Sequence, residues 1–170
     1  MIQLDVYWAG VNAGENRENL RADARDRLEE ILAQVFANHC QMTIVDDSRG
    51  EATAWHAWAA ARREGEEPQY PAGLEVQNAL PGSGRATVTC GGRQAVDRRL
   101  VGSDIGFGSV CPCCGEGGGD DYPAYFSVPI EVARKIVRHF AQTAQRLDGR
   151  VPLGDDGEVG EMAFDLQWQE

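Results

Sequence analysis

Three of the five cysteines of the chain lie within four positions, in the stretch VCPCCGEGGGDD that runs from Val110 to Asp121. Cys111 and Cys114 form a C-x-x-C pair, which can supply part of the ligand set of a structural zinc site. The sequence has no second C-x-x-C pair, and the other candidate ligands are scattered single residues: His39, Cys40, His56, Cys90 and His139. A small zinc-binding regulatory or structural protein that uses Cys111 and Cys114 is therefore the alternative hypothesis.

A redox role for the same cysteines is disfavoured by their neighbours on the C-terminal side. A thioredoxin-like pair lies at the start of a helix, which lowers the thiol pKa. Here Gly115, Glu116 and three further glycines come next, which do not start a helix, and the charge of Glu116 opposes a thiolate. We expect a glycine-rich loop with packed or incidental cysteines, no bound metal and no cofactor.

Known catalytic patterns are also missing from the sequence. There is no G-x-S-x-G nucleophile elbow and no phosphate-binding P-loop, and Gly106-Phe107-Gly108 does not lead into a helix. The zinc-deaminase pattern is incomplete, because no histidine begins H-x-E. We therefore expect a binding protein and not an enzyme. The competing hypothesis is an enzyme whose site is assembled from residues that sequence alone does not pair.

The chain is strongly acidic, with a net charge of -11 and a pI near 4.7. Such a surface repels nucleic acid, because nucleic-acid affinity rests on Lys and Arg that neutralise phosphates. No Lys or Arg occurs from Leu100 to Ala133 or from Val151 to Glu170, although both stretches are rich in Asp and Glu. These acids either solvate the surface or form a negative face that attracts a basic partner.

Length and hydropathy indicate one globular domain over residues 1–170. The chain has 170 residues, of which 42% are hydrophobic, and this is enough for one core. No apolar run approaches the roughly 20 residues needed to span a bilayer. The first residues, MIQLDVYWAG, lack the basic and apolar regions of a signal peptide. We expect a cytoplasmic protein with no membrane partner.

The N-terminal half alternates between strand and helix patterns. Strands are predicted over Gln3–Trp8 and Met42–Val45. A helix capped by Asn16 or Asn19 is predicted from the spacing of Leu20, Ala24, Leu28, Ile31, Leu32 and Val35. The alanine-rich stretch Glu51–Arg63 predicts a further helix.

The C-terminal half predicts a hairpin, a helix and a last strand. The hairpin joins Leu74–Leu80 to Arg85–Cys90, and Gln94–Val101 and Tyr122–Phe126 are candidate strands. A helix opens at Pro129 and ends at Asp148-Gly149, and its core stripe is predicted to be Val132, Ile136 and Phe140, with Ala133 and Val137 beside them. Met162–Trp168 alternates as a half-buried strand. The predicted fold class is α+β, a single domain with an antiparallel sheet and two to three helices packed on it.

The order of motifs in the second half of the chain resembles the immunity protein 1 family of bacterial polymorphic toxin systems. The matching residues, over roughly residues 70–170, are Tyr122-Pro123-Ala124, Val128-Pro129-Ile130-Glu131, Val132 to Phe140, Gln142-Thr143 and Gln167-Trp168. The chain departs from the family pattern where Gln145 to Gly149 replaces G-R-P, where an acidic loop, Leu153 to Glu161, is inserted, and in its cysteine cluster.

The resemblance implies an antidote that binds a cognate secreted toxin domain and blocks it, often a deaminase acting on DNA cytosine. It implies no catalytic residue. We expect the toxin to meet two acidic segments, Asp104 to Asp121 and Asp155 to Glu161, with Tyr122 and Tyr125 either as aromatic anchors or as packed strand residues. The predicted partner-binding residues are Asp104, Glu116, Asp120, Asp121, Tyr122, Tyr125, Asp155, Asp156 and Glu158.

Overall fold

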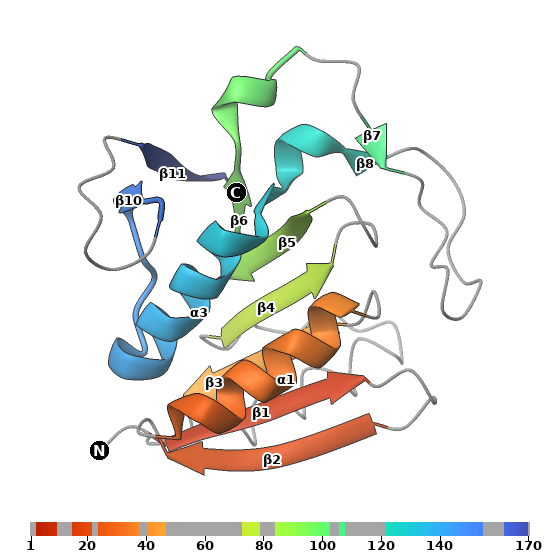
Figure 1. The fold of residues 1–170 in the computed structure, drawn as a ribbon, viewed down its shortest axis with the longest axis vertical. Helices are drawn as coiled ribbons and strands as arrows, with labels where there is room; N and C mark the ends of the chain where they lie inside the picture. Colours follow the sequence, from red (N-terminus) through yellow and green to blue (C-terminus); the bar gives the residue numbers. More distant parts are fainter. Residues whose placement is uncertain are drawn as a thin grey trace.

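The fold is an antiparallel sheet with helices on it, seen in a computed structural model (Figure 1). The structure describes residues 3–9, 15–21, 24–37, 41–46, 73–78, 84–102, 106–107, 122–154 and 162–169. Two α-helices lie in these ranges, α1 (Arg25–Ala37) and α3 (Ile130–Thr143), together with the single turns η2 (Arg98–Leu100) and η3 (Ala124–Phe126). The predicted α+β fold class is confirmed.

The main sheet has the strand order β10-β11-β6-β5-β4-β3-β1-β2, and β9 pairs with β5 beside this path. Its strands are β1 (Gln3–Ala9), β2 (Glu15–Arg21), β3 (Gln41–Asp46), β4 (Gly73–Asn78), β5 (Arg85–Cys90), β6 (Arg93–Val96), β9 (Val128–Pro129), β10 (Gly149–Pro152) and β11 (Ala163–Gln169). A separate two-stranded ladder joins β7 (Gly106–Phe107) to β8 (Tyr122–Pro123).

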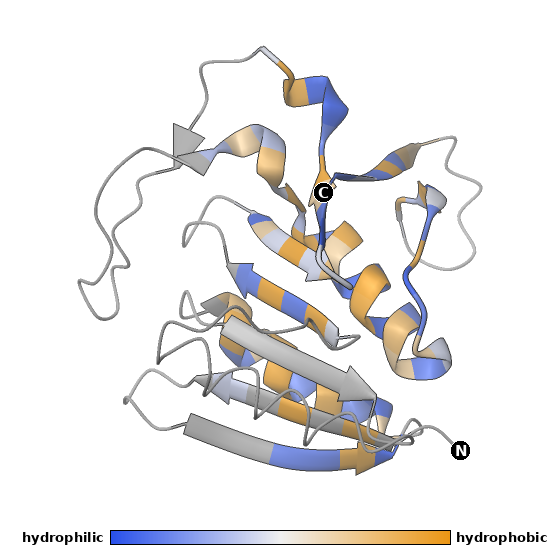
Figure 2. Cartoon of the chain, turned by 180° about the vertical axis from the view of Figure 1, so that it is seen from behind, coloured by the Kyte–Doolittle hydropathy of each residue, from blue (hydrophilic) through white to orange (hydrophobic). Residues whose placement is uncertain are grey.

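The central strands are apolar on one face, because side chains alternate across a strand. Val76 lies opposite Val88 and Leu74 opposite Cys90, and all four side chains are buried. This alternation of apolar and polar residues is visible along the central strands in Figure 2.

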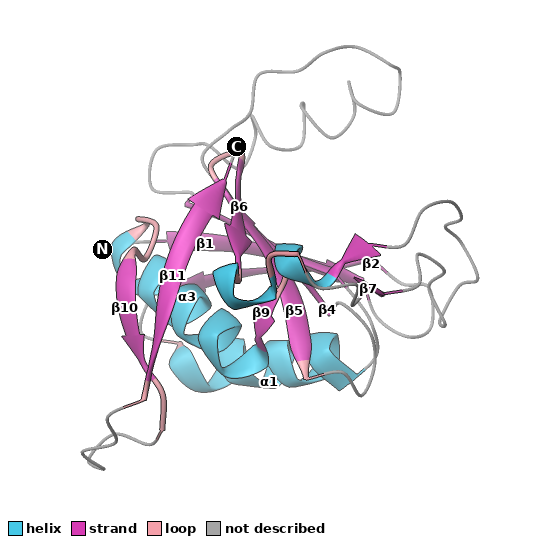
Figure 3. Cartoon of the chain, turned by 90° about the horizontal axis from the view of Figure 1, so that it is seen from above, coloured by secondary structure: helices cyan, strands magenta, loops and turns pink. Residues whose placement is uncertain are grey.

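The helices cover that apolar face (Figure 3). In α3 the buried stripe consists of Val132, Ala133, Ile136, Val137, Phe140 and Ala141. In α1 it consists of Leu28, Ile31, Leu32 and Val35. Both stripes were predicted from the helical period, apart from Ala141. Neither α1 nor α3, the helices in the described ranges, is long and apolar enough to cross a membrane.

The predicted start of the first helix is wrong. Asn16 and Asn19 do not cap α1 but lie in β2, opposite Trp8 and Asp5 of β1. Leu20 is buried opposite Leu4 in the sheet and not on the helix. The spacing of Leu20 and Ala24 fits a helical period by chance, and pairing with a distant strand decides the conformation.

The end of the second helix is also earlier than predicted. It stops at Thr143, and Ala144 takes a left-handed conformation with φ of 53°, from which its N–H donates to the carbonyl of Phe140. The residues at Asp148-Gly149 instead lead into β10. Of the candidate strand Gln94–Val101, only Gln94 to Val96 is extended, as part of β6, and η2 follows. Of the candidate strand Tyr122–Phe126, only Tyr122–Pro123 is extended, and η3 follows. The helix predicted at Glu51–Arg63 lies outside the described residues.

Replacing Ala144 by glycine should stabilise the protein. A left-handed backbone crowds the Cβ of an L-residue, and glycine removes that crowding. We expect Ala144→Gly to raise the free energy of unfolding by about 0.5–1 kcal/mol. As a control, Ala141→Gly inside the helix should lower it by about 1 kcal/mol. Urea unfolding of both variants checks this, and a loss in both would contradict the assignment of the cap.

Candidate functional site

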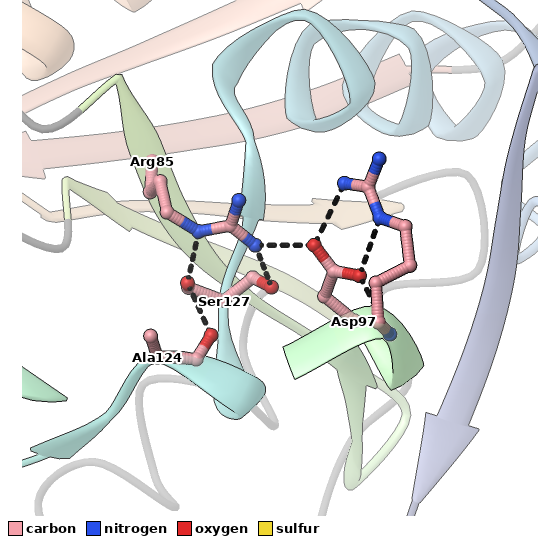
Figure 4. Close-up of polar contacts among 5 residues, drawn as sticks. Arg85, Asp97, Ala124 and Ser127 are labelled. Carbon is pink, nitrogen blue, oxygen red and sulfur yellow. Dashed lines mark hydrogen bonds and ion pairs between the residues drawn. The ribbon is translucent and has the colours of Figure 1, made fainter. Parts of the chain in front are cut away.

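Two polar side chains are buried in the described ranges, Asp97 and Ser127, and they belong to one cluster (Figure 4). Asp97 lies between β6 and η2, and Ser127 lies between η3 and β9. The two exposed fractions are 1% and 0%, so neither side chain reaches water to any useful extent. A buried carboxyl group has to be compensated by partners, and those partners define the site.

Two arginines, Arg85 and Arg99, donate hydrogen bonds to the Asp97 carboxylate. One carboxylate oxygen, Oδ1, accepts hydrogen bonds from the backbone N–H of Arg99 at 3.2 Å and from its Nε at 2.9 Å. The other oxygen, Oδ2, accepts from Nη2 of Arg99 at 2.8 Å and from Nη2 of Arg85 at 2.7 Å. Asp97 therefore accepts four hydrogen bonds, of which three come from cationic groups.

Arg85 extends the cluster to Ser127. Its Nε donates to the hydroxyl oxygen of Ser127 at 2.7 Å, and its Nη2 donates to the carbonyl oxygen of the same residue at 2.8 Å. The Ser127 hydroxyl in turn donates to the carbonyl of Ala124 at 2.7 Å. The hydroxyl thus donates its own proton and accepts from a cation, and this arrangement does not prepare a nucleophile.

The electrostatics keep Asp97 ionised. Burial raises the pKa of its carboxyl, but hydrogen bonds from Arg99 and Arg85, together with their charges, outweigh burial and hold the pKa below its usual value. An ionised carboxylate whose oxygens are already occupied is a poor general base. The cluster is built to hold segments of the chain together and not to move protons.

Among the predicted partner-binding residues, the structure describes the side chain of Tyr125 alone. Its hydroxyl donates to Oε1 of Gln169 at 2.6 Å, and its ring packs edge-on against Phe126 with 4.9 Å between ring centroids. The side chain is half-buried, so both interpretations of Tyr125, aromatic anchor and packed residue, stay predictions. The backbone of Tyr122 pairs with Phe107 in the β7–β8 ladder.

The remaining predicted partner-binding residues lie outside the described residues: Asp104, Glu116, Asp120, Asp121, Asp155, Asp156 and Glu158. The same holds for Cys111, Cys113 and Cys114. No group of three or more His, Cys, Asp or Glu side chains able to hold a metal ion occurs within the part of the chain that the structure describes.

Cys90 is the one cysteine whose surroundings are described. It lies in β5, is buried, and faces the helices. Burial raises the pKa of its thiol to about 11; the charge of Arg146 opposes this shift and that of Asp148 adds to it. A thiol with this pKa stays protonated at neutral pH, so Cys90 is a core residue and neither a nucleophile nor a ready metal ligand.

Charge is unevenly divided between the described ranges and the rest of the sequence. Of the 27 acidic residues, 12 lie in the described ranges and 15 outside them, whereas of the 16 basic residues 13 lie inside and three outside. The residues in the described ranges therefore carry a formal charge of +1, and all other residues together carry -12. Eight of those 15 acids belong to residues 103–121 and 155–161, which contain no Lys or Arg.

Comparison of the chain with protein-family models, curated proteins and solved structures gives no match. The resemblance to the immunity protein 1 family therefore stays a prediction from the motifs. Sequence reasoning missed the Asp97 cluster altogether. Its one local signal is an aspartate that follows Ala95-Val96 directly and precedes Arg98-Arg99.

Asp97→Asn should destabilise the protein at neutral pH, because Arg85 and Arg99 lose their counter-charge. Removing one partner of a buried ion pair costs about 3 kcal/mol or more. The lowered pKa means that the contribution of Asp97 is present above its unfolded pKa of about 3.9 and is lost as pH falls through the lower folded value. The difference between wild type and Asp97→Asn should therefore shrink below about pH 4. Urea unfolding across pH 7 to 3 measures this.

The exposed Asp165 of β11 provides the control for this series. Asp165→Asn should change the free energy of unfolding by less than about 0.5 kcal/mol at any pH in the series. If the free energy of unfolding of wild type and of Asp97→Asn differs by the same amount down to the lowest pH, the conclusion that Asp97 is ionised is contradicted.

Proposed function

We propose that this protein is an immunity protein, an antidote that binds and inhibits a cognate bacterial toxin domain. The observation that carries the proposal is the distribution of charge along the sequence. Residues 103–121 and 155–161 hold eight acidic residues and no Lys or Arg, in a chain whose net charge is -11. Such a local excess of acids is typical of a protein that presents negative charge to a basic partner.

The physics of inhibition fits an acidic binder. A toxin that acts on nucleic acid needs a basic cleft for the phosphates of its substrate. Carboxylates occupy such a cleft as phosphate substitutes, and complementary charge raises the association rate to about 10⁸–10⁹ M⁻¹s⁻¹ at low salt. Fast association matters for an antidote, because free toxin acts on the host until it is bound.

The motif resemblance supports a toxin of the DNA cytosine deaminase class. Under this proposal the acidic segments around Asp104 to Asp121 and Asp155 to Glu161 cover the active-site cleft of the toxin. The antidote itself performs no chemistry under this proposal. In keeping with this, Asp97, its two arginines and the Ser127 hydroxyl already form hydrogen bonds within the cluster.

A growth-rescue experiment tests this function. The toxin domain encoded next to this chain is expressed in a sensitive host, with this protein, with an unrelated immunity protein, or alone. We expect survivors with this protein only, because inhibition requires the matched partner. Absence of rescue while both proteins are shown to be folded and present would overturn the proposal.

Charge-reversal variants distinguish a specific toxin contact at Asp120 and Asp121 from an effect of net charge on the association rate. The double variant Asp120→Lys with Asp121→Lys should slow association with the toxin by about tenfold at low salt and flatten its dependence on ionic strength. A matched control is Asp26→Lys with Glu30→Lys, which changes the net charge equally at two exposed positions of α1. Stopped-flow association over a salt series measures both. Equal slowing by the two variants would place the contact elsewhere.

A further inference from the structure

The cysteine-rich stretch connects the two strands of a small ladder. The chain leaves the main sheet after β6 and η2, forms β7, and returns through β8, η3 and β9. Gly106 pairs with Pro123 and Phe107 pairs with Tyr122, so β7 and β8 form an antiparallel stem. The sequence of residues 108–121, with its cysteines and its acids, links the two strands of that stem.

The Asp97 cluster connects the two segments on either side of this stem. We call the segment from Asp97 through η2 to β7 the outgoing arm, and the segment from β8 through η3 to β9 the returning arm. The backbone N–H of Asp97, on the outgoing arm, donates to the carbonyl of Tyr125, on the returning arm, at 2.9 Å. Nε2 of Gln94 donates to the carbonyl of Phe126 at 3.2 Å. Arg85 contacts both arms at once, through Asp97 and through Ser127, and it belongs to β5 at the centre of the sheet (Figure 4).

The same cluster reaches the strand after the second acidic segment. The guanidinium carbon of Arg99 lies 4.9 Å from the ring centroid of Phe164, in β11. Phe164 comes shortly after residues 155–161 in the chain. Phe164 is buried, whereas Arg99 is largely exposed, so the stacked guanidinium covers the ring from the solvent side. Arg99 therefore connects Asp97 to β11, the strand that follows the second acidic segment.

Hydrogen bonds of this kind fix geometry more strictly than apolar packing does. A buried ion pair adds little net stability compared with well-packed apolar residues, but each bond is directional. Arg85 can hold Asp97 and Ser127 together only when the two arms keep one relative position. An apolar cluster would tolerate sliding of one arm against the other.

We propose that Asp97, Arg85 and Ser127 are positioning residues that fix the two flanks of the acidic segment between β7 and β8 in one arrangement for binding a basic partner. The identity of the partner rests on the proposed function above, whereas the positioning rests on the contacts at Asp97 alone. The two parts are therefore tested by separate measurements.

The partner-free measurement is hydrogen exchange in Asp97→Asn and Ser127→Ala. We expect exchange in peptides that cover residues 106–107 and 122–127 to accelerate by about tenfold or more, because removing a cluster bond frees both arms locally. The matched control is Val35→Ala, a buried position of α1, compared at equal free energy of unfolding. Equal acceleration in all three variants would overturn the positioning role. Ser127→Ala removes one hydroxyl and no charge, so it decides the question if Asp97→Asn does not fold.

The second measurement is toxin affinity of the same three variants. Asp97→Asn and Ser127→Ala should weaken binding by about tenfold, and Val35→Ala by less than about twofold. Unchanged affinity despite accelerated exchange would overturn the link between positioning and binding. If the wild-type protein does not bind the toxin at all, the proposed function fails, while the exchange result still decides the positioning.

Discussion

The buried and ionised carboxylate of Asp97 is the constraint on which the arrangement of β5, η2 and η3 depends. Asp97 keeps its charge only because Arg99 and Arg85 surround it, and each arginine is anchored to a different element. Leaving that charge unpaired would cost several kcal/mol, a large part of the roughly 5–15 kcal/mol that stabilises a typical domain. The chain therefore has to bring β5, η2 and η3 together for the fold to form.

The rest of the frame is held mainly by apolar burial. The helices α1 and α3 also share ion pairs, in which Glu29 accepts a hydrogen bond from Arg138 and lies 3.8 Å from Arg134. Partly exposed pairs of this kind contribute at most about 1 kcal/mol each. Each buried leucine or valine of the two helix stripes contributes about 1.5–3 kcal/mol. Apolar contacts hold the helices on the sheet, whereas the segments around Asp97 are held by polar bonds in addition to the burial of Ala124 and Val128.

This division explains what the sequence could predict. Helix α3 was found because Val132, Ile136 and Phe140 repeat with the helical period, and β11 was found because Phe164 and Leu166 alternate with polar residues. Strand β2 was missed because ENRENLR has a single apolar residue, Leu20, and its pairing with β1 depends on a distant segment. The Asp97 cluster was missed because its members come from three separate parts of the chain and because Asp, Arg and Ser are all residue types typical of a surface.

The hydrogen bonds around Asp97 allow a stably packed sheet and helices in a strongly acidic chain. Net charge far from zero destabilises a compact state through self-repulsion, and this cost is largest when like charges are close together. Here the described residues hold nearly equal numbers of acids and bases, 12 and 13, so repulsion among them costs their packing little. The excess of acids lies in other parts of the sequence, with eight acids in residues 103–121 and 155–161. Under the proposed function, these two acidic segments need fixed points at which they start and return. The arginine-neutralised Asp97 provides such a point without adding negative charge to the core.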